Sequence, residues 1–205
     1  MNFLAHLALA GPSDASRIGN ILGDFEKGTE EALLKRLPKE IVAGILMHRQ
    51  IDLFTDRHPV FRQARLLLAP ERRRFAGIII DIYFDHFLSQ HWSRYHPGTV
   101  TDFIQAVYQG FDRHPDWLGK EFGPLVPRLK RENWLVSYAS VEGLAQTLDR
   151  VANYSPRFAP VADAMPDLLE HRAPFEEHFL SFYPEARQHA ASLLGKNSLS
   201  TPAFP

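Results

Sequence analysis

Residues 37–56, LPKEIVAGILMHRQIDLFTD, carry the pattern that decides the fold. A proline suited to the first turn of a helix precedes apolar residues spaced three, four and seven apart, and His58-Pro59 ends the pattern. The main apolar stripe consists of Ile41, Val42, Ile45, Leu46 and Leu53. Other sides of the same helix carry Met47, Ile51 and Phe54. A helix that is apolar on several sides belongs in the interior of a protein.

A second central helix is predicted over residues 71–94, after Pro70. The isoleucines at 78–80 could form a short buried strand, but helical spacing continues for more than ten residues, so length favours a helix. Further helices are predicted at 13–25, 29–36, 60–68, 100–113, 118–131, 140–154 and 160–194, the last broken near Pro166, Pro174 or Pro184. Because hairpins and βαβ units are missing from the sequence, we predict an all-α fold.

The 205-residue chain predicts a single helical domain over residues 1–195 and a flexible tail over 196–205. Its 23 Lys and Arg balance 24 Asp and Glu, which argues against a dedicated nucleic-acid binder. The first residues have no basic start and are interrupted by His6, so they do not resemble a signal peptide. No apolar run approaches the ~20 residues that span a bilayer. We therefore expect a cytoplasmic protein that binds neither membrane nor nucleic acid.

Polar residues recur in pairs on the two central helices. His48 and Asp52 are four residues apart and share one side of the first helix, and Asp81 and Asp85 repeat this spacing on the second, followed by His86. A buried carboxylate costs several kcal/mol unless a cation or hydrogen bonds compensate it. Separate structural contacts could compensate these groups. His48 could pair with Asp52, Asp81 could pair with an arginine, and His86 could be a hydrogen-bonded core histidine. One or two metal ions would compensate all five, and we favour that interpretation.

One further carboxylate completes the candidate site. Asp24 lies in GNILGDF, residues 19–25, where glycines suit a close approach of backbone and ligand. The chain has no cysteine, so any metal must bind His, Asp or Glu, and an oxygen-rich set suits Mn²⁺, Mg²⁺ or Fe²⁺. Such a centre is suited to phosphoester hydrolysis. The predicted ligands are Asp24, His48, Asp52, Asp81, Asp85 and His86, with Asp24, His48, Asp85 and His86 as the predicted catalytic residues and His6 and His91 as weaker candidates.

A basic run precedes the second central helix. It contains five arginines and one glutamate, at Arg62, Arg65, Arg72, Arg73, Arg74 and Glu71. The run could be an ordinary solvated surface. It could also attract an acidic partner or a phosphate toward the metal site.

Four motifs in order resemble the acyl carrier protein phosphodiesterase family. They are MNFLAHL at 1–7, GN-x-L-x-DF at 19–25, VAGI-x-MHR-x-ID at 42–52 and D-x-x-x-DHFLS-x-HW at 81–92. WLVSY at 134–138 and F-x-x-FYP at 179–184 are similar to the family as well, so the resemblance extends from residue 1 to about residue 194.

The resemblance implies hydrolysis, best with Mn²⁺, of the phosphodiester between 4′-phosphopantetheine and a serine of acyl carrier protein. It also implies a helical fold like that of the HD phosphohydrolases, although Asp85-His86 stands in the reverse of the usual order. Carrier proteins are small and acidic, so the five arginines would bind one. Three alternatives stay open: an HD-type nucleotide phosphohydrolase, a helical module that binds carrier protein without catalysis, and a structural charge network without metal.

Overall fold

The helix predicted from residues 37–56 is present as α4 (Lys39–Arg57). It lies in the interior, as predicted, with Ile41 and Ile45 fully buried and Met47 3% exposed. Leu53, in contrast, is 41% exposed and lines a surface pocket together with residues of the last long helix of the chain. The buried stripe of α4 is therefore narrower at its carboxyl end than the sequence pattern indicates.

The computed structural model describes residues 2–199, with side chains up to Gly195, and contains helices but no strand within that range. The predicted all-α fold is confirmed. No helix in the described range is long and apolar enough to cross a bilayer. In addition to α4, the α-helices are α1 (Phe3–Leu9), α2 (Asp14–Leu22), α3 (Glu30–Leu34), α5 (Pro59–Leu66), α6 (Ala76–Gln90), α7 (Trp92–Tyr95), α8 (Val100–Arg113), α9 (Gly119–Phe122), α10 (Val126–Arg131), α11 (Trp134–Ser137), α12 (Val141–Ala152), α13 (Met165–Glu170) and α14 (Arg172–Leu199). Short 3₁₀ helices are η1 (Pro70–Phe75), η2 (Pro115–Trp117), η3 (Gly123–Leu125) and η4 (Pro156–Ala164).

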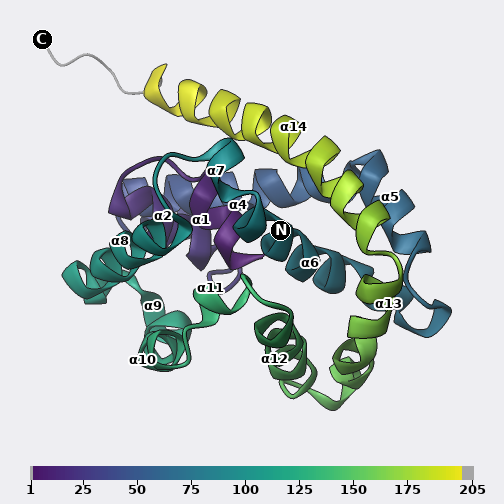
Figure 1. Cartoon of the computed structure of the whole chain (residues 1–205). Coiled ribbons are helices and arrows are strands. Elements are labelled where there is room, and N and C mark those ends of the chain that lie inside the picture. Colours follow the sequence, from purple (N-terminus) through teal and green to yellow (C-terminus); the bar gives the residue numbers. More distant parts are fainter. Residues whose placement is uncertain (1, 200–205) are drawn as a thin grey trace, which may run out of the picture.

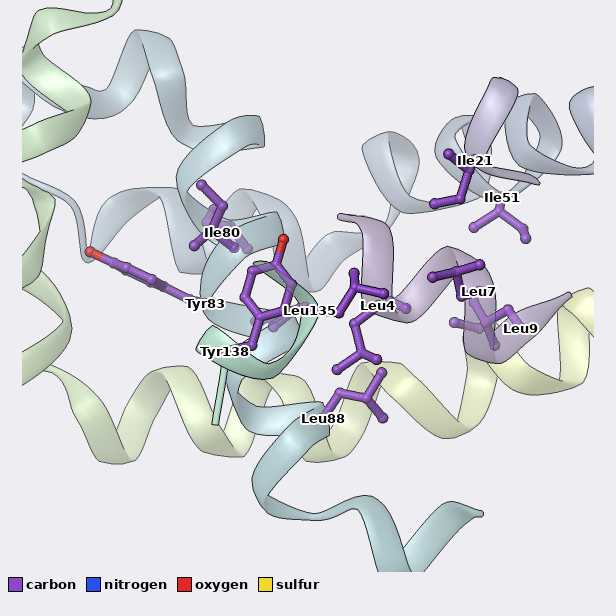
Figure 2. Close-up of a cluster of buried hydrophobic side chains, with 14 of the residues drawn as sticks. Leu4, Leu7, Leu9, Ile21, Ile51, Ile80, Tyr83, Leu88, Leu135 and Tyr138 are labelled. Atoms are coloured by element: carbon purple, nitrogen blue, oxygen red, sulfur yellow. The ribbon is translucent and has the colours of Figure 1, made fainter. Parts of the chain in front are cut away.

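The helices form one body in which α14 lies along one side and α12 lies on the opposite side (Figure 1). The short helix α1 lies at the centre, packed against α2 and α6. Figure 2 shows its side chains Leu4, Leu7 and Leu9 within the hydrophobic core, and Leu88 of α6 near Leu4. Burial on this scale is the main source of stability for a helix of seven residues, which would not persist alone.

Helices α2 and α4 touch through their backbones. Gly44 of α4 lies against Gly19 of α2, and a Cβ atom added at Gly44 would be 2.8 Å from the Cα atom of Gly19. Only glycines permit so close an approach. The contact fixes the end of α2, and therefore the loop that carries Asp24, beside α4.

The second central helix is shorter than predicted. The segment 71–94 is divided into η1, α6 and α7, and the backbone departs from helical geometry at His91. The isoleucine run is helical, as predicted, and Ile79 and Ile80 are fully buried within α6. The basic residues at 72–74 therefore belong to a 3₁₀ turn rather than to the long helix.

The predicted helix over 160–194 is broken twice. Residues 160–164 belong to η4, which ends beside Pro166, as predicted, and a second break separates α13 from α14 at His171. Pro184, in contrast, lies inside α14 without ending it. Its neighbours Phe182 and Tyr183 are fully buried, so packing offsets the hydrogen bond that proline removes. Helix α14 continues to Leu199, into the predicted tail, and residues 200–205 lie outside the described range.

Candidate metal centre

Two histidines from distant parts of the chain lie side by side. His6 of α1 and His48 of α4 stack with their ring centroids 3.9 Å apart and their planes at 21°. Both residues are buried, with exposed fractions of 1% and 2%. His6 is on the central helix α1, and His48 is one turn beyond the point where α4 meets α2, so packing of three helices fixes both rings.

A carboxylate joins the two imidazoles. Asp52 of α4 lies with Oδ1 3.0 Å from His6 Nε2 and with Oδ2 3.0 Å from His48 Nε2. Asp24, in the loop after α2, places Oδ1 3.4 Å from His48 Nε2. The residue before it must be glycine, because a Cβ at Gly23 would be 2.2 Å from His48 Cγ. The four side chains thus form one cluster, which we call the His/Asp cluster.

One side of the cluster is open to solvent. The side chains of Asp24 and Asp52 are 48% and 38% exposed, whereas both imidazoles are buried. The buried rings fix the position of the donor atoms, and the exposed carboxylates leave room for a ligand to approach. This division between a fixed inner side and an open outer side is what a binding site requires.

Without a metal, the pKa values of the four side chains determine which of them carries a proton. Burial and the neighbouring His48 lower the pKa of His6 to about 4, so this ring is neutral at pH 7. Burial opposes charging of His48, but hydrogen bonds to Asp24 and Asp52 raise its pKa to about 9. Burial would raise the pKa values of both carboxyls, but the hydrogen bonds from His48 keep them below their usual values. His48 is therefore the protonated member between two carboxylates.

The arrangement fits a divalent cation. Ligand atoms of His6, His48 and Asp52 all lie within 4.8 Å of one another. Octahedral bonds of about 2.1 Å place adjacent ligand atoms ~3 Å apart, close to the separations between Asp52 and the two imidazoles. A cation could replace the shared protons with little movement of the side chains. Two imidazoles with one or two carboxylates are a suitable set for Mn²⁺ or Fe²⁺.

Asp81 and Asp85 of α6 both lie near α1, and Asp85 forms hydrogen bonds with the backbone of that helix. Both oxygens of the fully buried Asp85 accept hydrogen bonds from the first turn of α1, from Leu4 N at 2.8 Å and from Ala5 N at 3.0 Å. Burial raises the pKa of Asp85 to about 8, although these hydrogen bonds oppose the shift. Asp81 is half-buried, and burial raises its pKa to about 6, with Asp52 contributing. Asp85 therefore holds the helix that carries His6.

His86 and His91 lie outside the His/Asp cluster. His86 is fully buried, with Nδ1 2.7 Å from the Tyr138 carbonyl and Nε2 3.2 Å from Arg172 Nη1. The arginine donates to Nε2, so Nδ1 carries the proton and donates to the carbonyl. His91 pairs with Glu176 at 2.6 Å. For His86 the structure matches the alternative of a hydrogen-bonded core histidine.

The basic run divides into structural and exposed members. Arg72 donates from Nε and Nη2 to the two oxygens of Asp167 at 2.7 and 2.8 Å, and Arg73 Nε donates to the Leu68 carbonyl at 2.9 Å. The guanidinium groups of these two arginines therefore hold η1 in place, and their role in binding a partner stays a prediction. The members that stay exposed are Arg62, Arg65 and Arg74.

Sequence reasoning underrated His6 and missed a supporting residue. Arg49, next to His48, donates to the carbonyls of Gly28 and Glu26 at 2.8 Å each, which ties the loop containing Asp24 to α4. Its place in the MHR motif was the available signal. His6 lay in a segment too short for helical periodicity, so nothing in the sequence placed it against His48.

The fold and the site define an all-α protein with two stacked histidines joined by a carboxylate at a solvent-exposed face. A family model described as acyl carrier protein phosphodiesterase matches residues 1–186. The acyl carrier protein phosphodiesterase of Yersinia pestis is 38% identical over 191 residues, which cover 93% of this chain and 97% of that protein. The protein of the same name from Escherichia coli O157:H7 is 39% identical over 193 residues, 93% and 98% of the two chains. The chain belongs to the acyl carrier protein phosphodiesterase family. No solved structure matches it at a significant level.

Proposed function

We propose that this protein is a metal-dependent phosphodiesterase that removes 4′-phosphopantetheine from holo acyl carrier protein. Hydrolysis of the phosphodiester would give apo acyl carrier protein and 4′-phosphopantetheine. The observation that carries the proposal is the Asp52 carboxylate between His6 Nε2 and His48 Nε2, 3.0 Å from each. The substrate follows from the name that the relatives share.

His6, His48 and Asp52 would hold the cation, with Asp24 beside them, and Mn²⁺ is the expected ion, with Mg²⁺ and Fe²⁺ as alternatives. When bound, the cation would polarise a phosphoryl oxygen and make water a nucleophile at neutral pH. The chain itself supplies position and charge. The buried imidazoles fix the site, and the exposed sides of Asp24 and Asp52 leave the substrate a path of approach. Asp85 keeps His6 in place through α1.

The test is intact-mass spectrometry of holo acyl carrier protein after incubation with the purified protein. We expect the carrier protein to lose the mass of phosphopantetheine with Mn²⁺ and to keep it with EDTA, because the cluster needs a cation to act on a phosphodiester. Separate reactions with Mg²⁺ and Fe²⁺ would rank the ions.

Persistence of the holo mass with every ion would contradict the proposal. Two further measurements then distinguish the alternatives. Release of phosphate from nucleotides would identify a nucleotide phosphohydrolase, and tight binding of carrier protein without any reaction would identify a binding module.

A further inference from the structure

A groove of about 570 Å³ lies where η1 and the start of α6 meet η4. Its lining is both basic and aromatic, and it shares no residue with the His/Asp cluster. The lining residues are Arg74, Phe75, Gly77, Ile78, Arg157 and Phe158. We call it the arginine groove.

Each arginine of the groove stacks on the aromatic ring that follows it in the sequence. The Arg74 guanidinium lies 4.6 Å from the centre of the Phe75 ring, and that of Arg157 lies 4.9 Å from the Phe158 ring. The two rings pack edge to face, with centroids 6.0 Å apart. These contacts hold two exposed cations over one aromatic platform, which reduces the entropy lost when a ligand binds them.

The two cations are left without a carboxylate partner among the described residues. Arg72, only two residues before Arg74, forms an ion pair with Asp167 at 2.7 Å. Arg74 and Arg157 have no such ion pair within residues 2–195. An anion that enters the groove therefore does not have to displace an internal carboxylate first, and it gains two charge-assisted contacts.

Helix α6 links the groove with the surroundings of the His/Asp cluster. Ile78 lines the groove, and Asp81 follows three residues later on the same side of α6, a rise of ~4.5 Å. Asp81 lies close enough to Asp52 for their charges to interact. A partner seated in the groove therefore contacts the first turn of the helix that carries Asp81 one turn further on.

We propose that the arginine groove is the docking surface for an acidic segment of the carrier-protein substrate. Carboxylates of the partner would pair with Arg74 and Arg157, and an apolar side chain between them would lie on Ile78 and Phe158. The inference rests on the proposed function. The proposed docking surface is narrower than the five-arginine run predicted from the sequence. It keeps Arg74 of that run and adds Arg157 from a distant part of the sequence.

The test variant combines Arg74→Ala with Arg157→Ala. We expect KM for holo carrier protein to rise about tenfold or more while kcat stays unchanged, and the dependence of KM on salt to weaken. The matched control combines Arg94→Ala with Arg187→Ala. These arginines are also exposed and stacked, 5.7 and 5.9 Å from the Tyr95 ring, so the control removes the same charge elsewhere. Thermal unfolding would verify that both variants fold.

Binding of apo carrier protein, measured by titration calorimetry, separates this inference from the proposed function. If the wild-type protein released no phosphopantetheine, the function would fail, yet the calorimetry would still decide the docking surface. Binding lost in the groove variant and kept in the control supports the inference. No binding by the wild-type protein, equal affinity in all three proteins, or equal loss in both variants overturns it, since equal loss would mean attraction by net charge alone.

Discussion

Replacing Asp52 with asparagine is expected to lower kcat for release of phosphopantetheine by about 10³-fold, the scale on which loss of an electrostatic group in an active site acts. The substitution keeps the shape of the side chain but removes its charge. It also turns an amide N–H toward one of the two imidazoles, so only one of the two Nε2 atoms still faces an oxygen. The rate is measured by intact mass under saturating Mn²⁺.

Asp56→Asn is the matched control for this variant. Asp56 lies four residues further along α4 and is exposed, so the control has the same chemical change on the same helix. We expect its kcat to remain within about twofold of wild type, since surface substitutions of this kind have small effects. A normal rate in Asp52→Asn would show that the carboxylate is not needed and would remove the basis for the metal site.

Replacing Asp85 with alanine is expected to destabilise the protein by about 3 kcal/mol, because it leaves two buried backbone N–H groups of α1 without acceptors. Loosening α1 also displaces His6, so we expect the affinity for Mn²⁺ to fall about 10- to 100-fold, as for other residues that orient metal ligands. Urea denaturation and Mn²⁺-dependent activity measure the two effects.

Saturating Mn²⁺ distinguishes a residue that positions a ligand from a ligand itself. If Asp85 acts through α1, excess Mn²⁺ restores most of kcat in Asp85→Ala. If kcat stays low at every Mn²⁺ concentration, Asp85 takes a direct part in catalysis, as the sequence motif indicated. Asp149→Ala, at an exposed position of α12, is the control for stability and should change it by less than ~0.5 kcal/mol.

The helical fold could be predicted because its long helices carry strong patterns. Helix α4 has buried apolar residues at helical spacing, and α6 has an uninterrupted isoleucine run, so both follow from local sequence. Helix α1 could not be found in this way, because seven residues hold too few repeats to define a period. Its stability comes from Asp85 and from the core around Leu4, both of which depend on tertiary contacts.

Of the contacts in the candidate site, only the one between two residues of the same helix could be predicted from the sequence. His48 and Asp52 are four residues apart, so their contact follows from helical geometry. The meeting of His6 with His48 depends on how α1 packs, and that of Asp24 with His48 depends on Gly23. A shared position of Asp85 and His86 could not be predicted from their adjacency, because adjacent residues on a buried helix point in different directions. Asp85 faces α1, and His86 faces Tyr138.

Calorimetric titration of the metal-free protein with Mn²⁺ tests the central claim that the His/Asp cluster is a metal site. The cation must displace the proton of His48, whose pKa is raised to about 9, so affinity should increase as the pH rises from 6 toward 9, with proton release. His48→Ala should lose the binding. Absence of binding heat at any pH, or equal affinity in wild type and His48→Ala, would contradict the account.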